Sequence, residues 1–432
     1  MKPNIIFIFS DQQRPDTMGI YGQSLPVTPC LDSLARDGVW YQNAFTVNPV
    51  CGPARSSLQT GLYPTASGCF RNDKALPKNA HTITHSLKDN GYHTAYIGKW
   101  HLASDSENNH RTSTIPADRR GGYDYWMAAD VLEFTSNSRG GYVFNTAGEK
   151  VEFTGYRADC ITDFAVDYLK TAKKEKPFFL FVSYIEPHHQ NNANRYEGPE
   201  GSKEKWSNYT VPGDLIGKGG DWKESYPDYL GCCNAVDSGA GRIINTLKEK
   251  GIYENTVIIY ASDHGSHFRT RNEEYKRSCH ENSIHIPLII RGGNFRGGKR
   301  VDQLVSLIDI PSTILSIAGG KPLPLMHGND LTKNQSHETV FVQISESQVG
   351  RAVRDKRYKY SVHAPELNGW HDSCSSVYVD EFLYDLQKDP YEQKNLVSDP
   401  NYRKIKENLR KKLVQKMIEY GEAAPEIKEA QQ

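Results

Sequence analysis

The sequence predicts an α/β fold in which helices sandwich a large, mostly parallel sheet and a smaller antiparallel sheet follows. Helix-like stretches such as Thr82–Asn90 and Asp237–Lys250, each closed by a glycine, separate the expected strands. Strands that alternate with helices favour a parallel sheet covered on both faces. Four apolar, β-prone runs have the length and composition of buried strands: Asn4–Ser10, His93–Ile97, Pro177–Tyr184 and Thr256–Ser262.

The length of the chain predicts two domains, because 432 residues exceed what one hydrophobic core normally supports. We place the first domain at residues 1–333, where the run Ile286–Arg291 supplies a fifth strand, and the second at residues 334–432. A charged helix from residue 401 to 419 should pack on the second sheet, and the polar tail 422–432 should fray. The second domain contains short alternating segments that predict antiparallel strands: Val340–Ser345, Arg351–Ser361 and Glu381–Asp385.

The composition excludes several classes of partner. Lys plus Arg and Asp plus Glu both total 52, so no overall charge attracts nucleic acid or an anionic membrane. No apolar run approaches the roughly 20 residues needed to span a bilayer, so we expect no membrane partner. The apolar run 4–9 is not followed by a signal-peptide cleavage site. We therefore expect a periplasmic or secreted protein if an export signal was trimmed from this chain, and a cytoplasmic protein otherwise. Eight cysteines in a chain this long do not suggest a disulfide framework.

Polar, chemically capable residues follow each of the four predicted buried strands. In open α/β sheets the ligand site lies beyond the carboxyl ends of the strands, so these clusters should meet at one edge. That convergence predicts a functional site without reference to any known protein. The clusters are Asp11-Gln12, then Lys99 and His101, then His188-His189, and finally Asp263-His264.

Cys51 opens a segment that predicts a reactive thiol. Pro53 suits the first turn of a helix, so Cys51 should lie at a helix N-terminus, where free N–H groups and partial positive charge favour an anion. Arg55 adds a fixed cation one turn along. The same field stabilises a thiolate. A lone cysteine before a helix is more often an inert loop thiol. The residues around Cys51 therefore have to distinguish a reactive thiol from an inert one.

These neighbours form the pattern Cys-x-Pro-x-Arg, extended by Leu58 and Thr60-Gly61. The segment resembles the type I sulfatases of the alkaline phosphatase superfamily, and further family segments recur from residue 4 to about residue 396. The resemblance implies a sulfuric ester hydrolase. It also implies that a formylglycine-generating or sulfatase-maturing enzyme oxidises Cys51 to formylglycine, whose hydrate is the nucleophile.

The resemblance further implies a divalent metal. Asp11, Gln12, Asp263 and His264 resemble the family's metal ligands, and the oxidised Cys51 completes the set. Carboxylate and amide oxygens suit calcium, which the family usually holds, or magnesium. Many relatives carry Asp at the position of Gln12 and Asn at that of His264. Both departures lower the negative charge of the predicted site.

Five cationic or titratable residues resemble the family's sulfate-binding and proton-transfer groups: Arg55, Lys99, His101, His188 and Lys276. A sulfate ester carries one negative charge, and its leaving alkoxide is very basic, so the site must neutralise oxygens and supply a proton. The resemblance implies that His188 or Lys276 protonates the leaving oxygen. It implies that His101 then draws a proton from the second hydroxyl of the nucleophile.

We expect a sulfated sugar or a polysaccharide fragment as substrate, contacted by Asn72, His280, Trp370 and His371. Many family members carry tyrosine where His280 stands. One alternative is a phosphonate monoester or phosphodiester hydrolase of the same superfamily, although those enzymes tend to lack the pair formed here by Lys99 and His101. A second alternative is a non-catalytic carbohydrate-binding relative, which would leave the thiol of residue 51 unmodified.

Overall fold

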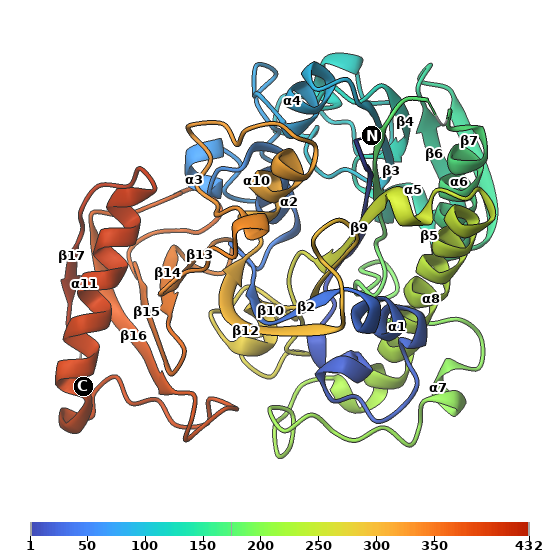
Figure 1. Cartoon of the computed structure of the whole chain (residues 1–432). Coiled ribbons are helices and arrows are strands. Elements are labelled where there is room, and N and C mark those ends of the chain that lie inside the picture. The colour runs from blue at the N-terminus through green and yellow to red at the C-terminus, as the bar shows by residue number, and fades with distance from the viewer. Residues whose placement is uncertain (1, 174, 431–432) are drawn as a thin grey trace.

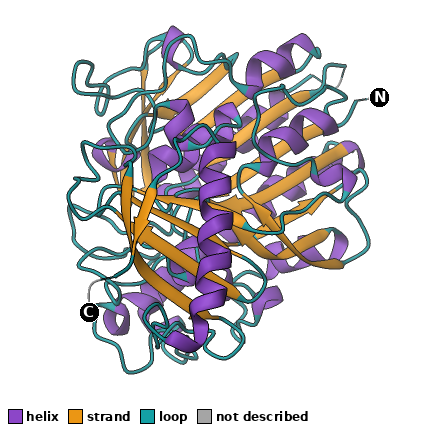
Figure 2. Cartoon of the chain, turned by 90° about the vertical axis from the view of Figure 1, so that its left-hand side faces the viewer, coloured by secondary structure: helices purple, strands orange, loops and turns teal. Residues whose placement is uncertain are grey.

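The computed structural model describes residues 2–173 and 175–430 and contains two sheets (Figure 1). The large sheet has twelve strands in the order β10-β2-β11-β9-β1-β8-β3-β4-β6-β5, with β12 paired to β2 and β7 paired to β6. Strands β13 to β17 form the smaller sheet in chain order. Helices flank the large sheet, and one long helix lies against the small one (Figure 2). The predicted fold class is confirmed.

The strands are β1 Asn4–Ser10, β2 Val39–Phe45, β3 His93–Lys99, β4 Tyr125–Ala129, β5 Ser136–Asn137, β6 Arg139–Asn145, β7 Lys150–Tyr156, β8 Phe178–Ser183, β9 Thr256–Ser262, β10 His285–Ile286, β11 Leu288–Arg291, β12 Lys299–Ser306, β13 Val340–Ile344, β14 Gly350–Arg354, β15 Tyr358–His363, β16 Val377–Asp385 and β17 Glu426–Lys428. The α-helices are α1 Pro29–Asp37, α2 Cys51–Thr60, α3 Pro64–Ser67, α4 Ile83–Asp89, α5 Leu132–Thr135, α6 Arg157–Thr171, α7 Ser202–Lys205, α8 Trp222–Glu249, α9 Glu281–Ile284, α10 Asp309–Ile317 and α11 Arg403–Glu419. Short 3-10 helices are η1 Pro15–Thr17, η2 Gly19–Tyr21, η3 Ala117–Arg119, η4 Tyr253–Asn255, η5 Leu331–Lys333 and η6 Pro400–Tyr402.

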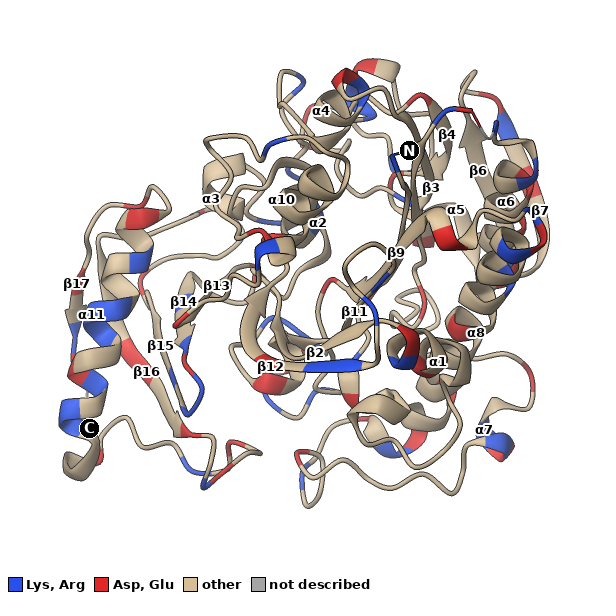
Figure 3. Ribbon diagram, in the orientation of Figure 1, with Lys and Arg blue, Asp and Glu red and all other residues tan. Residues whose placement is uncertain are grey.

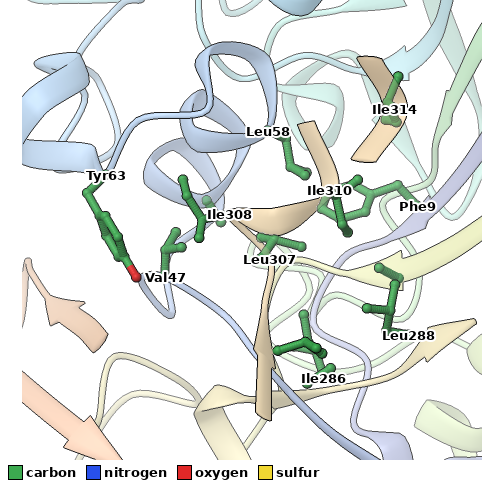
Figure 4. Close-up of a cluster of buried hydrophobic side chains, with 14 of the residues drawn as sticks. Phe9, Val47, Leu58, Tyr63, Ile286, Leu288, Leu307, Ile308, Ile310 and Ile314 are labelled. Atoms are coloured by element: carbon green, nitrogen blue, oxygen red, sulfur yellow. The ribbon is translucent and has the colours of Figure 1, made fainter. Parts of the chain in front are cut away.

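Strand β1 shows why the large sheet is covered on both faces. Its side chains alternate between two hydrophobic clusters, as the two-residue period of a strand requires. Phe7 and Phe9 pack with Leu58 of α2, on the side that also receives α4 and α10 (Figure 4). Ile6 and Ile8 pack on the opposite side, which α1, α6 and α8 cover. The central residues 5–9 of this strand are all apolar, which fits a strand that is buried on both faces.

The centre of the large sheet is parallel. Strand β1 pairs in parallel with β8 and β9, and β3 pairs in parallel with β8 and β4. Antiparallel strands flank this centre, with β11 on β9 at one side and β6 on β4 at the other. The carboxyl ends of β1, β3, β4, β8 and β9 therefore lie along one edge.

Two sequence predictions differ from the observed elements in informative ways. The run predicted as one strand, Ile286–Arg291, is divided at Pro287 into β10 and β11, because proline supplies no N–H to a ladder. The helix predicted from Asp237 begins at Trp222 instead and passes through Pro227. Burial of the apolar face of α8 against α6 outweighs the local cost of that proline.

The predicted fraying of the C-terminal tail is wrong for the described residues up to 430. Strand β17 pairs in parallel with β16, which makes the small sheet antiparallel except at this edge. Glu422 is buried and accepts hydrogen bonds from Arg351 Nε at 2.9 Å and from Gln343 Nε2 at 2.7 Å. A buried arginine requires such a counter-charge, so this carboxylate anchors the tail. Residues 431–432 lie outside the described residues.

The two sheets share one hydrophobic core. Tyr63, which follows α2, packs its ring against Phe341 of β13 and Tyr420 beyond α11, with ring centroids 5.2 Å and 4.3 Å apart. Glu281 in the large domain pairs with Arg354 at 3.4 Å and Lys359 at 3.3 Å in the small sheet. The domain division between residues 333 and 334 stays a prediction.

Charges of both signs are interspersed along the ribbon of both sheets, and the long helix α11 is rich in Lys and Arg (Figure 3). Within residues 2–173 and 175–430, no helix combines the length and apolar composition needed to cross a membrane. All eight cysteines are free thiols.

Candidate active site

The carboxyl ends of the central strands bring together the residues predicted from sequence. Ser10 and Ser262 are partners in the β1–β9 register, so Asp11 and Asp263 leave the sheet side by side. Lys99 is the last residue of β3, and His188 lies in the turn that follows β8. Each is buried.

Cys51 is the first residue of α2, as the sequence predicted, and lies at the centre of this group. Its Sγ is 2.9 Å from Lys276 Nζ, 3.4 Å from Asp11 Oδ1 and 3.5 Å from His264 Nε2. Lys276 Nζ is also 3.2 Å from His188 Nε2 and 3.2 Å from His264 Nε2. Distant parts of the chain thus converge on one thiol.

The surroundings of Cys51 favour its ionised form. Burial raises the pKa of the thiol, but the charges of Lys276 and Lys99 outweigh burial and lower the pKa well below its ordinary value. The same thiolate and its neighbouring carboxylates hold both lysines charged, although burial opposes this. These surroundings therefore favour the thiolate, and the reactivity predicted from sequence stays a prediction.

Four side chains have the arrangement of a cation site: Asp11, Cys51, Asp263 and His264 each offer a ligand atom within 4.8 Å of the others. Burial, and then the charge of Asp11, raise the pKa of Asp263 to about 7, because two carboxylates are forced together. Asp263 Oδ2 is buried without a hydrogen-bond partner among the described residues. An orphaned oxygen between close carboxylates is chemically suited to a hard divalent cation. The predicted metal ligands therefore fit such an ion.

Gln12 lies beside these four residues in a strained backbone conformation, with φ of 72°. Its backbone N–H donates to Asp263 Oδ1 at 2.9 Å, and its side-chain Nε2 donates to Tyr196 at 2.6 Å and Ser266 at 3.1 Å. Its Oε1 accepts from the His189 N–H at 3.4 Å. The side chain is thus firmly oriented, and its predicted role as a metal ligand stays a prediction.

Arg55 and Lys99 contact Oδ2 of Asp11, whereas Cys51 lies beside Oδ1 of the same carboxylate. Arg55 Nη2 and Lys99 Nζ lie 3.0 Å and 2.9 Å from Asp11 Oδ2. Arg55 Nη1 also donates to the Lys99 carbonyl at 2.8 Å and to Ser183 Oγ at 2.6 Å, so β3, β8 and α2 are tied together here. Two fixed cations therefore face the nucleophile position.

Sequence analysis missed Asp130 and Glu133, which follow the short strand β4. Asp130 Oδ1 accepts the N–H groups of Leu102 and Ala103, both at 2.9 Å, and the Asp130 carbonyl accepts the N–H of His101 at 2.7 Å. These bonds hold His101 at φ of 59°. Glu133 Oε1 lies 3.2 Å from Lys99 Nζ. The available signal was a further strand end at the same edge of the sheet.

The predicted substrate residues separate into two groups. Asn72 lies beside the nucleophile, since its Oδ1 accepts the Gly52 N–H at 2.9 Å. Trp370 is 40% exposed and lies between the guanidinium groups of Arg71 and Arg277, 5.8 Å and 5.9 Å from its ring centroid. Arg277 directly follows Lys276, so this exposed ring borders the site.

His280 and His371 do not share that environment. His280 is 4% exposed, its Nε2 is 3.1 Å from Tyr384 Oη, and its ring packs on Phe382. It belongs to the contact between the two sheets and has no face open to a substrate. His371 is exposed on the loop after Trp370. The predicted substrate contacts of both histidines stay predictions that this placement does not favour.

A further residue that sequence analysis missed, Glu346, reaches from the small sheet to the site. It is buried, with φ of 66°, and its carboxylate accepts the Asn72 N–H at 2.7 Å and Arg277 Nε at 2.5 Å. The turn after β13 thereby fixes the segment beside Gly52 and the residue beside Lys276. A residue of the C-terminal part of the chain therefore contacts both segments.

Comparison with known proteins matches residues 3–320 to the model of the family described as Sulfatase. Residues 274–419 match the family described as N-sulphoglucosamine sulphohydrolase, C-terminal. Both matches include site residues, because the first contains Cys51 and both contain Lys276.

Individual relatives match over nearly the whole chain. An ulvan-active sulfatase of Formosa agariphila is 29% identical, covering 98% of this chain and 82% of its own length. An uncharacterized sulfatase of Escherichia coli, YidJ, is 30% identical, covering 96% of this chain and 87% of its own. A candidate sulfatase from Bacteroides fragilis, yidJ, superposes with a TM-score of 0.85 at 26% identity, covering 98% of this chain and 96% of the other.

Proposed function

The chain belongs to the sulfatase family of sulfuric ester hydrolases, and from that premise we propose that it hydrolyses a sulfated sugar or polysaccharide fragment using formylglycine made from Cys51 and a divalent metal. The observation that carries this proposal is the convergence of three cations: Lys276 contacts the side chain of residue 51, and Lys99 and Arg55 contact the neighbouring Asp11. A similar relative is named for its activity on ulvan, which supports a sulfated carbohydrate as substrate.

Fixed cations explain how the site binds a sulfate ester. The ester presents one negative charge spread over three oxygens, and a buried site must neutralise that charge. Lys99 and Lys276 are each almost fully buried, at 0% and 1% exposure, and both carry positive charge. Arg55 is held by Asp11 and Ser183 and cannot move toward solvent. Each cation is oriented before the substrate arrives, so binding requires little reorganisation.

Lys276 and His188 are placed to move a proton to the leaving oxygen. His188 Nδ1 donates to the His189 carbonyl at 2.6 Å, which leaves Nε2 free to accept from Lys276 Nζ at 3.2 Å. Burial, and then the charge of Lys276, lower the pKa of His188, so its ring is neutral beside a charged lysine. Lys276 is therefore the proton donor, and His188 orients it.

Formylglycine and a divalent cation, when present, supply a hydrated aldehyde as nucleophile and a Lewis acid that favours its ionisation. Asp11, Asp263, His264 and residue 51 would hold the cation, with Gln12 as a further candidate. Calcium or magnesium suits the two carboxylates. In this proposal His101, whose N–H donates to the Asp130 carbonyl, would remove a proton from residue 51. Conversion of Cys51 requires a maturation enzyme as partner.

The alternative chemistries make different demands on the same residues. A phosphonate or phosphodiester hydrolase of the superfamily tends to lack the pair that Lys99 and His101 form here. A binding module has no need for a thiol that two lysines hold ionised. Both observations favour the sulfatase chemistry.

Comparison of ester classes tests the proposal. The matured enzyme is assayed with a panel of sulfated oligosaccharides, an aryl sulfate, an aryl phosphonate and a phosphodiester, and kcat/KM is compared. We expect sulfate release from at least one sulfated sugar with the highest kcat/KM. Faster turnover of the phosphonate would reject the sulfatase assignment. Binding of sulfated sugar without sulfate release would support the non-catalytic alternative.

A further inference from the structure

Glu133 is a buried acid inside the cationic site. It lies in α5, directly after the carboxyl end of β4, and its side chain is 7% exposed. Its Oε1 is 3.2 Å from Lys99 Nζ, which also contacts Asp11 at 2.9 Å. A carboxylate in direct contact with a lysine that should bind sulfate is unexpected, because its negative charge opposes the binding of an anion.

This acid is ionised. Burial raises the pKa of Glu133, but its positively charged surroundings, with the Lys99 ammonium group first among them, lower it to about 2. Lys99 belongs to the proposed sulfate-binding set. Glu133 therefore brings a negative charge into the region where the substrate ester would lie.

One oxygen of this carboxylate is unsatisfied. Within residues 2–173 and 175–430, Glu133 Oε2 is buried and has no hydrogen-bond partner. An ionised carboxylate accepts several hydrogen bonds, and a buried oxygen without a donor is unfavourable. The sulfate group itself has only acceptor oxygens and cannot supply this donor. A sugar hydroxyl can, and many sulfated sugars carry a hydroxyl on a ring carbon next to the sulfated one.

We propose that Glu133 determines specificity by accepting a hydrogen bond from a hydroxyl group adjacent to the sulfated carbon of the substrate. This inference rests on the proposed function and narrows its substrate class. Sugars with a free hydroxyl beside the sulfate are preferred over those with hydrogen there. Sugars with a second sulfate at that position are rejected most strongly, because they place like charges together and offer no donor.

The expected changes in kcat/KM follow from the negative charge of the Glu133 carboxylate. Loss of a hydrogen bond to an ionised group lowers kcat/KM by about 10- to 100-fold, and a second sulfate lowers it further. A purely positioning role, in which Glu133 only orients Lys99, makes a different prediction. Its removal would then slow all sulfated sugars by the same factor and leave their ratios unchanged.

The experiment compares three versions of the sugar that the panel above shows to be turned over fastest. These versions carry hydroxyl, hydrogen or a second sulfate beside the scissile sulfate. The matured wild-type enzyme and Glu133→Gln are assayed on all three, and kcat/KM ratios are taken within each enzyme, so that losses of active protein cancel. Glu366→Gln, at an exposed glutamate in the loop after β15, is the control.

We expect the wild type and Glu366→Gln to prefer the hydroxyl version at least about tenfold over the deoxy version. In Glu133→Gln the discrimination against the disulfated version should fall at least about tenfold, because glutamine is neutral and carries a donor. Equal wild-type rates on the three versions, or unchanged ratios in Glu133→Gln, would overturn the inference and leave the sulfatase function intact. Absence of turnover across the whole sulfated panel would reject the proposed function and this inference together.

Discussion

Replacing Lys99 with methionine removes the cation that two carboxylates share. Its Nζ is fully buried, 2.9 Å from Asp11 and 3.2 Å from Glu133. At an effective dielectric constant of about 20, the Lys99–Glu133 attraction is about 5 kcal/mol. Asp11 keeps Arg55 at 3.0 Å, so Glu133 becomes the uncompensated charge. We expect the free energy of unfolding to fall by about 3–5 kcal/mol and the rate of sulfate release to fall at least about 100-fold.

A second substitution separates stability from catalysis. In Lys99→Met/Glu133→Gln the buried charge is removed together with its partner, so most of the lost stability should return while the rate stays low. Urea unfolding followed by circular dichroism gives the free energies, and sulfate release from the best sulfated sugar gives the rates. The control pair Lys150→Met/Glu152→Gln removes an exposed ion pair at 2.7 Å and should change stability by less than about 1 kcal/mol.

Two outcomes would contradict this reasoning. A near-wild-type rate in Lys99→Met would show that the lysine does not stabilise the reacting ester. Recovery of the rate in the double variant would show that only folding was impaired. Both outcomes are read from the rate of sulfate release, because a change in the free energy of unfolding does not by itself distinguish catalysis from folding.

Three further predictions concern other buried groups. His188→Ala should lower kcat at least about 100-fold, because Lys276 loses its orienting acceptor; a wild-type kcat in steady-state assays would remove His188 from the mechanism. Glu422→Ala leaves Arg351 buried without its carboxylate and should lower the free energy of unfolding by about 3–5 kcal/mol in urea unfolding. The exposed control Glu426→Gln should leave it unchanged. A Glu422→Ala variant as stable as the wild type would mean that Glu422 does not anchor the tail. Burial raises the pKa of Asp237 from 3.8 to about 6. Its carboxyl group therefore binds a proton more tightly in the folded state than in the unfolded state, and the free energy of unfolding of the wild type should fall as pH rises from about 4 to 6. Asp237→Asn should reduce that fall, measured by urea unfolding across this pH range, and an unchanged slope would refute the assignment.

Much of the site was predictable from sequence because its residues follow buried strands. The runs that end near Ser10, Ser183 and Ser262 are largely apolar, and the run that ends at Lys99 is β-prone, which favours all four as central parallel strands. Their carboxyl ends must then meet at one edge, whatever the loops do. The family resemblance added Lys276, which lies in a loop and has no strand to indicate its place.

The residues that sequence analysis missed depend on tertiary contacts. Strand β4 is short and partly exposed, so its end did not mark Asp130 and Glu133 as site residues. Glu346 reaches the site only because the two sheets share a core. The polar tail gave no sign of its ordered path, since the reason is a single buried partner, Arg351. His280 was matched to a motif position, but its ring is buried against β16.

The mass of the peptide that contains residue 51 tests the central claim most directly. The enzyme is purified from its native host, shown to release sulfate, digested and analysed by mass spectrometry. Conversion of the thiol to an aldehyde makes this peptide lighter by about 18 Da, and we expect that species to account for the active fraction. A fully active preparation in which the peptide retains the mass of unmodified cysteine would contradict the account.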